Sequence, residues 1–393
     1  MSLNVKQNQA LNFVGQGHNL LILGSAGTGK SFLINSIVEM CKQLGKTCAV
    51  TATTGIACSV YPPQLNPMTI HRWSGIGDGR YGPSEIKRIV SNNVKFTDVL
   101  TRVKNTDVLV VDEVSMMSKR FLESLNEVCS LKNETLFFGG LQVILVGDFL
   151  QLAPVPCARY NEDGCYCFES DVFNQAFPHV TILTEVVRQN ERDMIKAIRE
   201  ISIGVVSDET IKLLKELQRP LQDETIKLFS TNDLVDDYNR DRILDFPGPI
   251  HETISIDTGD KKYLKGQTTP RNLWLKIGYP VMLIKNYQIV FDPRKNAVVA
   301  VREQYPLKPA YALTIHKSQG MTLERVEVDC RDIFKPGQLG VAMGRACTLE
   351  GLRVINFTSK VCIQQPEKIL RFVNAEDSLK TEQDRSCCNS FVR

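Results

Sequence analysis

The sequence has little excess of either charge, since 47 lysines and arginines stand against 44 aspartates and glutamates, a formal net charge of +3. Any surface that binds nucleic acid must therefore be a local groove, because the total charge gives no support for one. No apolar run reaches the roughly 18 to 20 residues that span a bilayer, so we expect no membrane association. The first residues also lack an Arg-rich amphipathic leader, and mitochondrial import is not supported.

The twelve cysteines lack the paired C-x-x-C spacing of a zinc site. Only Cys157, Cys165 and Cys167 cluster, and because a fourth ligand is missing, reduced structural thiols are favoured over metal binding there. The scatter of the cysteines through apolar runs, with no signal peptide in residues 1–16, favours a reducing intracellular compartment. With 43% hydrophobic and 23% charged residues, the chain is globular and long enough for two or three domains.

A glycine-rich octapeptide after the apolar run 20–23 is the most informative feature that is present. It consists of Gly24, Ser25, Ala26, Gly27, Thr28, Gly29, Lys30 and Ser31. The pattern is typical of a P-loop, whose backbone N–H groups surround nucleotide phosphates at the start of a helix, here predicted over residues 32–43. Lys30 would reach the β- and γ-phosphates and Ser31 would bind Mg²⁺. The alternative, a structural glycine turn, is disfavoured because the octapeptide lies between a predicted strand and a predicted helix.

Two carboxylates and an amide follow other predicted strands. The run 108–111 leads into Asp112 and Glu113, and the run 143–146 is followed by Gln151. At the carboxyl edge of a parallel sheet, Asp112 would hold Mg²⁺ and Glu113 would orient and deprotonate the attacking water. Gln151 would sense the γ-phosphate, although a turn glutamine bonded to backbone is the alternative. No Asn-Lys-x-Asp motif for guanine occurs, which favours ATP over GTP.

Two arginines of the expected second domain are candidates for neutralising charge on the γ-phosphate. Arg188 lies in Val-Val-Arg-Gln and Arg345 in Val-Ala-Met-Gly-Arg-Ala. An arginine in this role contributes roughly 10³ to 10⁵ in rate. Taken alone, each of the two is better explained as an ordinary surface arginine. Assigning them to the γ-phosphate therefore depends on the other motifs of the chain.

Apolar runs recur along the chain with helical or loop segments between them, which predicts an α/β fold with parallel sheets covered by helices. We expect a first domain over residues 1–185, a second over 186–375 and a flexible tail over 376–393. Helices are predicted at 190–203, closed by Gly204, and at 208–217, and residues 247–274 are expected to be irregular. The predicted strands are 20–23, 47–51, 108–111, 143–146, 181–183, 226–229, 253–256, 281–284, 310–314, 324–329 and 352–357.

Taken together, the motifs resemble those of the petite-integration-frequency family of DNA helicases, in the RecD-like branch of helicase superfamily one. Ten blocks in family order carry the resemblance and cover nearly the whole chain: residues 3–7, 24–31, 52–57, 69–71, 112–116, 138–142, 147–152, 188–189, 314–322 and 341–346. The block that ends in Phe-Gly-Gly-Leu-Gln is similar to the signature that separates this family from its cousins.

The resemblance implies two tandem RecA-like domains that use ATP and Mg²⁺ to move 5′ to 3′ along single-stranded DNA and to unwind forked or structured DNA. It implies a monomer in the nucleus or elsewhere in the cell with DNA, acting in repair, recombination, replication or telomere maintenance. Gln7 would recognise adenine, and Gln319 with Gly320 would couple ATP to the strand. The residues implied near DNA are Thr54, Gly55, His71, His316 and Lys317, with Trp73 expected to stack on bases.

The sequence departs from the family pattern in one major respect. The family inserts a small DNA-gripping β-barrel late in the second domain, and only residues 287–301 fill that gap here. This length predicts a truncated or absent barrel. The alternative function is therefore an ATPase or binding module that depends on single-stranded DNA but does not unwind duplexes.

Overall fold

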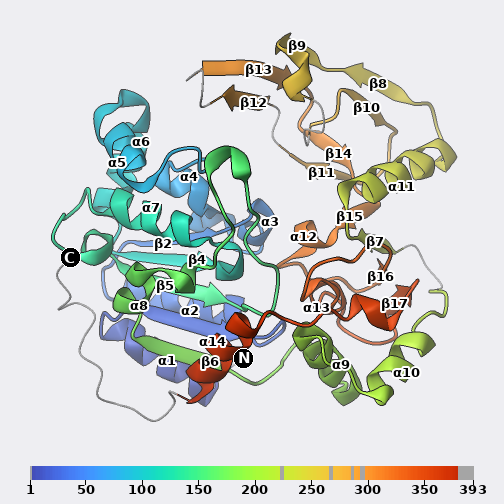
Figure 1. The fold of residues 1–393 in the computed structure, drawn as a ribbon, viewed down its shortest axis with the longest axis horizontal. Helices are drawn as coiled ribbons and strands as arrows, with labels where there is room; N and C mark the ends of the chain where they lie inside the picture. Colours follow the sequence, from blue (N-terminus) through green and yellow to red (C-terminus); the bar gives the residue numbers. More distant parts are fainter. Residues whose placement is uncertain (1, 222–224, 265–268, 285–286, 293–296, 379–393) are drawn as a thin grey trace.

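The first lobe of the molecule is built on a six-stranded sheet. The computed structural model describes residues 2–221, 225–264, 269–284, 287–292 and 297–378 (Figure 1). The sheet has the order β3-β2-β4-β5-β1-β6 and all its strand pairs are parallel. Its strands are β1 (Leu20–Gly24), β2 (Cys48–Ala52), β3 (Met68–Thr69), β4 (Val108–Asp112), β5 (Gln142–Gly147) and β6 (His179–Leu183).

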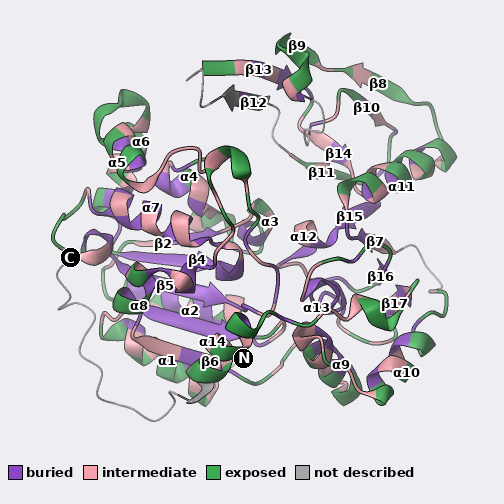
Figure 2. Cartoon of the chain, in the orientation of Figure 1, coloured by how far each residue is buried: buried purple, intermediate pink, exposed green. Residues whose placement is uncertain are grey.

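Both faces of this sheet are buried, which explains why its strands are continuous apolar runs. Successive side chains of a strand point to opposite faces. Leu20 and Ile22 therefore join one core cluster with α1 (Val5–Gly15) and α2 (Lys30–Gln43), whereas Leu21 and Leu23 join another. That second cluster is covered by α4 (Ile70–Ser74), α5 (Pro83–Asn92), α6 (Thr97–Asn105), α7 (Lys119–Cys129) and α8 (Asp171–Ala176). Figure 2 shows the buried sheet between its more exposed helices.

The second lobe repeats this plan on a smaller scale. Its sheet has the order β15-β7-β16-β17 and is again parallel, which confirms the predicted pair of α/β sheets. Helix α9 ends at Gly204, whose φ of 88° is the left-handed conformation that closes a helix. The elements are β7 (Ile226–Phe229), β15 (Ala312–Thr314), β16 (Val326–Asp329), β17 (Leu352–Ile355), α9 (Arg192–Ile203), α10 (Asp208–Glu216), α11 (Asn232–Asp245), α12 (Ile315–Ser318) and α13 (Gln338–Met343).

An antiparallel insertion lies between β7 and β15 at the upper right of Figure 1. It contains β8 (His251–Ile254), β9 (Ile256–Gly259), β10 (Asn272–Leu275), β11 (Val281–Leu283), β12 (Tyr287–Asp292), β13 (Ala297–Glu303) and β14 (Leu307–Pro309). Residues 247–274 do leave the second sheet as expected, but they are not irregular, because β8, β9 and β10 form there. In the described residues the strands make three open sheets, β10-β8, β11-β14 and β12-β13-β9, and none closes into a barrel. Residues 293–296, within the predicted short segment, lie outside the described residues.

The last described helix, α14 (Glu367–Ser378), returns to the first lobe. Ile369 is fully buried in the first lobe's core, and the ring of Phe372 stacks on Phe168 with centroids 4.1 Å apart. The domain boundaries at residues 185 and 375 stay a prediction. By packing, α14 belongs to the first lobe, although its residues 367–375 fall in the predicted second domain and 376–378 in the predicted tail. Most of the predicted tail, 379–393, lies outside the described residues. Among the described helices, none is long and apolar enough to cross a bilayer.

Candidate active site

The predicted P-loop joins β1 to α2. Gly27 and Gly29 adopt φ of 82° and 81°, which favours glycine, and a Cβ on Gly27 would lie 2.8 Å from the Cβ of Arg188. Helix α2 starts at Lys30 with no side-chain cap, so its first N–H groups are open to an anion. Lys30 Nζ donates to the carbonyls of Gly24 and Ser25 at 2.8 and 3.0 Å. Burial lowers the pKa of Lys30, while the nearby carboxylates act in the opposite direction.

The predicted pair of carboxylates lies at the carboxyl end of β4. Asp112 and Glu113 are 5% and 6% exposed. Burial, followed by the charge of Glu113, raises the pKa of Asp112 to about 6. Asp112 Oδ2 accepts a hydrogen bond from the Tyr61 hydroxyl at 2.5 Å, and Oδ1 accepts one from the Glu113 N–H at 2.8 Å. Glu113 has a φ of 56°, an uncommon conformation for a residue with a side chain, of the kind that clusters at functional sites.

The turn after β5 brings an amide beside the same sheet edge. Gln151 Nε2 donates to Asp148 Oδ2 at 3.1 Å, but its Oε1 is buried without a hydrogen-bond partner. A turn glutamine satisfied by the backbone, which is the alternative to a γ-phosphate sensor, would leave no such unpaired atom. Burial raises the pKa of Asp148 and Lys30 opposes this shift. Sequence reasoning missed Asp148, although its place directly after β5 marked it as a carboxylate at this edge.

The second lobe and the linker before it supply two arginines. Arg188 Nη1 donates to the carbonyl of Gly344 at 2.7 Å, and Arg345 Nε donates to that of Val341 at 2.9 Å. Arg345 is 2% exposed, so the interpretation of it as a surface arginine is wrong. Burial, then the charge of Arg188, lowers its pKa to about 10, and it remains charged at neutral pH.

Gln319 makes a direct contact between the lobes. It follows α12, and its Nε2 donates to Glu113 Oε2 at 2.9 Å. Its Oε1 is buried without a partner. Gly320 comes next with a φ of 85°, and a Cβ there would lie 3.6 Å from Glu113 Oε1. The predicted base and the predicted coupling element are therefore in contact across the interface.

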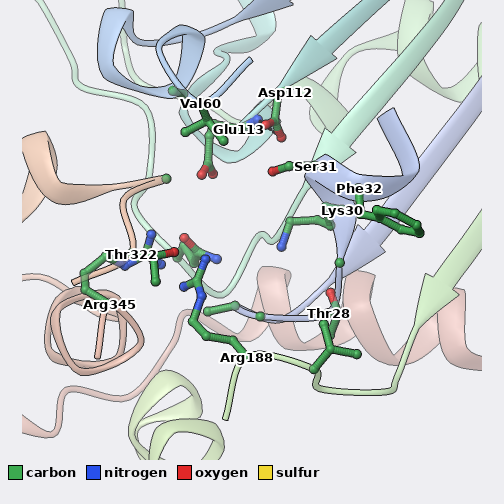
Figure 3. Close-up of a pocket in the computed structure, with 17 residues that line it drawn as sticks. Thr28, Lys30, Ser31, Phe32, Val60, Asp112, Glu113, Arg188, Thr322 and Arg345 are labelled. Atoms are coloured by element: carbon green, nitrogen blue, oxygen red, sulfur yellow. Dashed lines mark hydrogen bonds between the residues drawn. The ribbon is translucent and has the colours of Figure 1, made fainter. Parts of the chain in front are cut away.

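These groups surround one cleft of about 240 Å³ between the lobes. In Figure 3, Lys30 and Ser31 enter from the P-loop, Glu113 points in from β4, and Arg188 and Arg345 come from the opposite side. The cleft is lined by the predicted residues Ala26, Gly27, Thr28, Gly29, Lys30, Ser31, Asp112, Glu113, Gln151, Arg188, Gly320 and Arg345, together with Phe32, Ala57, Val60, Val187 and Thr322. Of the other predicted nucleotide residues, Gly24, Ser25, Gln7 and Gln319 adjoin the cleft without lining it.

The donor set suits a nucleotide with Mg²⁺. Ser31 and Asp112 are oxygen donors on the same cleft, which is the ligand type that Mg²⁺ takes alongside substrate phosphates. Gln7, in the first turn of α1, lies beside the P-loop, because a Cβ on Gly29 would come within 2.8 Å of its Nε2. Gln7 is 5% exposed and its Oε1 accepts from the Asn4 N–H, so it is held in place by a capping box.

Four of the predicted DNA residues lie where the lobes meet. Thr54 caps α3 (Gly55–Cys58) by accepting from the Ala57 N–H, and Gly55 is exposed beside it. His316 and Lys317 are on α12, and the backbone that follows α12 approaches α3, since a Cβ on Gly320 would lie 3.4 Å from the Cα of Ala57. Burial lowers the pKa of His316 to about 4, so this histidine is neutral at pH 7.

Helix α4 carries the other two predicted DNA residues. His71 is half-buried, with its ring centroid 4.5 Å from that of Phe121. Trp73 is 2% exposed and lies in the core cluster under α5 and α6. This structure contradicts the prediction that Trp73 stacks on bases, because its side chain is buried in that cluster and not exposed to a strand.

The cysteine cluster offers no metal site in the part of the chain that is described. Cys167 is fully buried in the first lobe's core, whereas Cys157 and Cys165 are only partly buried. No group of three or more His, Cys, Asp or Glu side chains is arranged to hold a metal ion among the described residues.

Sequence reasoning also missed Tyr61, whose hydroxyl binds Asp112, because no local pattern links the two residues.

Comparison with known proteins agrees with this geometry. The family described as PIF1-like helicase matches residues 2–208, more than half of the chain. The chain is 31% identical to the ATP-dependent DNA helicase PIF1 of Danio rerio, with 94% of the chain and 63% of the relative covered. It is 25% identical to the ATP-dependent DNA helicase RRM3 of Saccharomyces cerevisiae, over 96% of the chain and 68% of that protein. The chain thus spans about 63% of the length of several curated relatives that it matches.

Solved structures are similar over nearly the whole of this chain. The Pif1 helicase of Candida albicans has a TM-score of 0.86 and 29% identity, covering 96% of this chain and 99% of that one. A Bacteroides Pif1 bound to single-stranded DNA has a TM-score of 0.82 and 26% identity, covering 96% and 98%. With the family match, the two parallel sheets and the cleft between them, these similarities identify the chain as a member of the PIF1-like helicase family.

Proposed function

We propose that the chain is a DNA-stimulated ATPase that moves 5′ to 3′ along single-stranded DNA and unwinds forked or structured DNA. The cleft between the lobes carries this proposal. The first lobe contributes the P-loop and the base Glu113, and the second contributes Arg345, so hydrolysis requires both lobes in contact. The relatives named above are ATP-dependent DNA helicases, and one similar structure binds single-stranded DNA.

In the proposed reaction, Lys30 and the open N–H groups of α2 bind the phosphates. Ser31 and Asp112 would hold Mg²⁺, which neutralises phosphate charge when bound. Glu113 takes a proton from the attacking water, and Gln319 keeps its carboxylate oriented. Arg188 and Arg345 neutralise charge that develops on the γ-phosphate. Gln151 offers an unpaired acceptor that can report whether the γ-phosphate site is filled.

ATP hydrolysis with and without single-stranded DNA tests the proposal. We expect DNA to raise the rate of the wild-type chain. Glu113→Gln should retain nucleotide binding but lose about 10² to 10⁴ in rate, because only the base is removed. Asp163→Asn is a matched control, since this exposed carboxylate lies away from the cleft. A rate that DNA does not change would refute the proposed motor.

Direction and unwinding need a second assay. Duplexes with a 5′ or a 3′ single-stranded tail distinguish the two directions, and we expect unwinding only with the 5′ tail. The open two- and three-stranded sheets of the insertion favour a second candidate, an ATPase that binds DNA without separating strands. DNA-stimulated hydrolysis with no unwinding of either duplex would support that candidate. We further propose that the chain acts as a monomer, inside the cell, in repair, recombination, replication or telomere maintenance.

A further inference from the structure

Tyr61 connects the two residues that would hold Mg²⁺. The residue is 3% exposed and its hydroxyl donates to Asp112 Oδ2 at 2.5 Å. A carboxylate only accepts hydrogen bonds, so the phenol must be the donor, which leaves its oxygen able to accept. Burial and then Asp112 raise the pKa of the Tyr61 phenol, and the nearby Ser31 hydroxyl opposes this shift. One tyrosine oxygen therefore lies next to both predicted ligands.

The position of the Tyr61 ring is fixed by packing and by the backbone. The ring belongs to the core cluster that includes Val110 of β4 and Ile34 of α2, the elements that carry Asp112 and Ser31. The Tyr61 N–H donates to the carbonyl of Cys58, which closes the turn after α3. Pro62 and Pro63 follow and restrict the backbone on the other side. The hydroxyl is thus delivered by a rigid segment.

The contact has a definite effect on the carboxylate. The terminal torsion of an aspartate is broad when nothing holds it. Here Oδ2 is held by Tyr61 and Oδ1 by the Glu113 N–H at 2.8 Å, so rotation of the group would break both hydrogen bonds. Groups that bind a metal ligand in this manner orient it, and their loss typically reduces metal affinity or activity about 10- to 100-fold.

We propose that Tyr61 is a positioning residue of the magnesium site, which holds Asp112, beside Ser31, in the orientation that binds the Mg²⁺ of the nucleotide. This rests on the proposed function, since it concerns the same cleft. Tyr61 is not among the residues that line the cleft, so we expect it to make no direct contact with the nucleotide. Its contribution should therefore be seen in the response to Mg²⁺ and not in nucleotide binding without metal.

The test compares Tyr61→Phe with Tyr279→Phe. Tyr279 is a matched control, since it is 5% exposed and its hydroxyl donates to the carbonyl of Asn239 at 2.9 Å within the second lobe. Binding of a fluorescent ADP analogue is measured against Mg²⁺ concentration and again in EDTA. Binding of Mn²⁺ is followed separately by the loss of its free EPR signal. We expect Tyr61→Phe to raise the half-saturating Mg²⁺ about 10-fold, with binding in EDTA unchanged.

A structural role alone would lower the melting temperature of both variants and leave the Mg²⁺ response of both unaltered, which would overturn the proposal. A double-mutant cycle gives an independent outcome. In an Asp112→Asn background, Tyr61→Phe should cause no further change in half-saturating Mg²⁺, and a full additional 10-fold change would also overturn it. Failure of the wild-type chain to hydrolyse ATP would refute the proposed function, whereas an active wild type with an unshifted Tyr61→Phe refutes this inference alone.

Discussion

The two lobes make unequal contributions to the cleft. The first lobe presents the P-loop, the pair of carboxylates and Gln151 at the ends of β1, β4 and β5, which are adjacent in its sheet. The second lobe presents Arg345 after α13 and Gln319 with Gly320 after α12. We therefore expect nucleotide binding to depend mainly on the first lobe and hydrolysis to depend on contact between the two lobes. A DNA strand that bound both lobes, as proposed, would therefore have a direct route to the rate of hydrolysis.

Removing the positive charge of Arg345 in the second lobe should give the largest change in the rate of ATP hydrolysis. We expect Arg345→Ala to reduce ATP hydrolysis by about 10³ or more, because this buried residue lines the cleft and would neutralise charge on the γ-phosphate in the proposed reaction. Nucleotide affinity, measured by equilibrium fluorescence, should change much less. Arg219→Ala is the control, since Arg219 likewise donates to carbonyls of the second lobe but is exposed. Equal losses of nucleotide affinity and hydrolysis rate in Arg345→Ala would mean that nucleotide binding depends on the second lobe as much as hydrolysis does.

A smaller effect is expected at the contact between the lobes. Gln319→Ala removes the hydrogen bond to Glu113 and should reduce the DNA-stimulated rate about 10-fold, the magnitude of one hydrogen bond to a charged group. The rate without DNA should fall less. Gln319 adjoins α12, which carries the proposed DNA residues His316 and Lys317, so its hydrogen bond should matter most when DNA is bound.

Gln338→Ala separates this coupling effect from a general loss of stability. Gln338 is also fully buried, but its Nε2 donates to the carbonyl of Ser230 within the second lobe. This variant should melt at a lower temperature and keep the ratio of stimulated to basal rate. If Gln319→Ala also kept that ratio, the interface hydrogen bond would not transmit DNA binding to the base.

Much of the nucleotide site could be predicted from sequence because its motifs are local and its strands are parallel. The octapeptide, Asp112 with Glu113 and Gln151 each follow an apolar run, and the carboxyl ends of parallel strands meet at one sheet edge. Their convergence on one cleft thus required no knowledge of distant contacts. The place of the arginines could not be predicted in this way, since only the contact between the lobes brings Arg188 and Arg345 to that edge.

Other features depend on packing that no local pattern reveals. Trp73 lies near His71 in a stretch of mixed polarity, and only the packing of the helices over the first sheet shows that its ring is in the core. The strands of the insertion are short and expose apolar side chains such as Ile256 and Leu283, 66% and 77% exposed, so their periodicity is weak. Helix α14 packs on residues some two hundred positions earlier, such as Phe168. The hydrogen bond of Tyr61 to Asp112 is likewise long-range.

The smallest expected effect is a change in folding stability with pH, caused by His316 on α12. The folded protein binds a proton at His316 with a pKa of about 4, against 6.5 for an ordinary histidine, because burial and then Lys335 disfavour the charged form. As the pH falls from 7 to 5 the unfolded chain gains this proton and the folded chain does not, so folding stability falls, by up to about 2 kcal/mol.

The melting temperature of the wild type should therefore fall more between pH 7 and pH 5 than that of His316→Gln, which has no proton to gain. His251→Gln, a change at an exposed position on β8, should leave the wild-type difference unaltered. An equal fall in wild type and His316→Gln would mean that this histidine takes up its proton as readily in the folded protein as in the unfolded chain, and is charged at pH 5. The second lobe would then present a further cation beside Lys317, and its contribution to DNA binding should weaken as the pH rises.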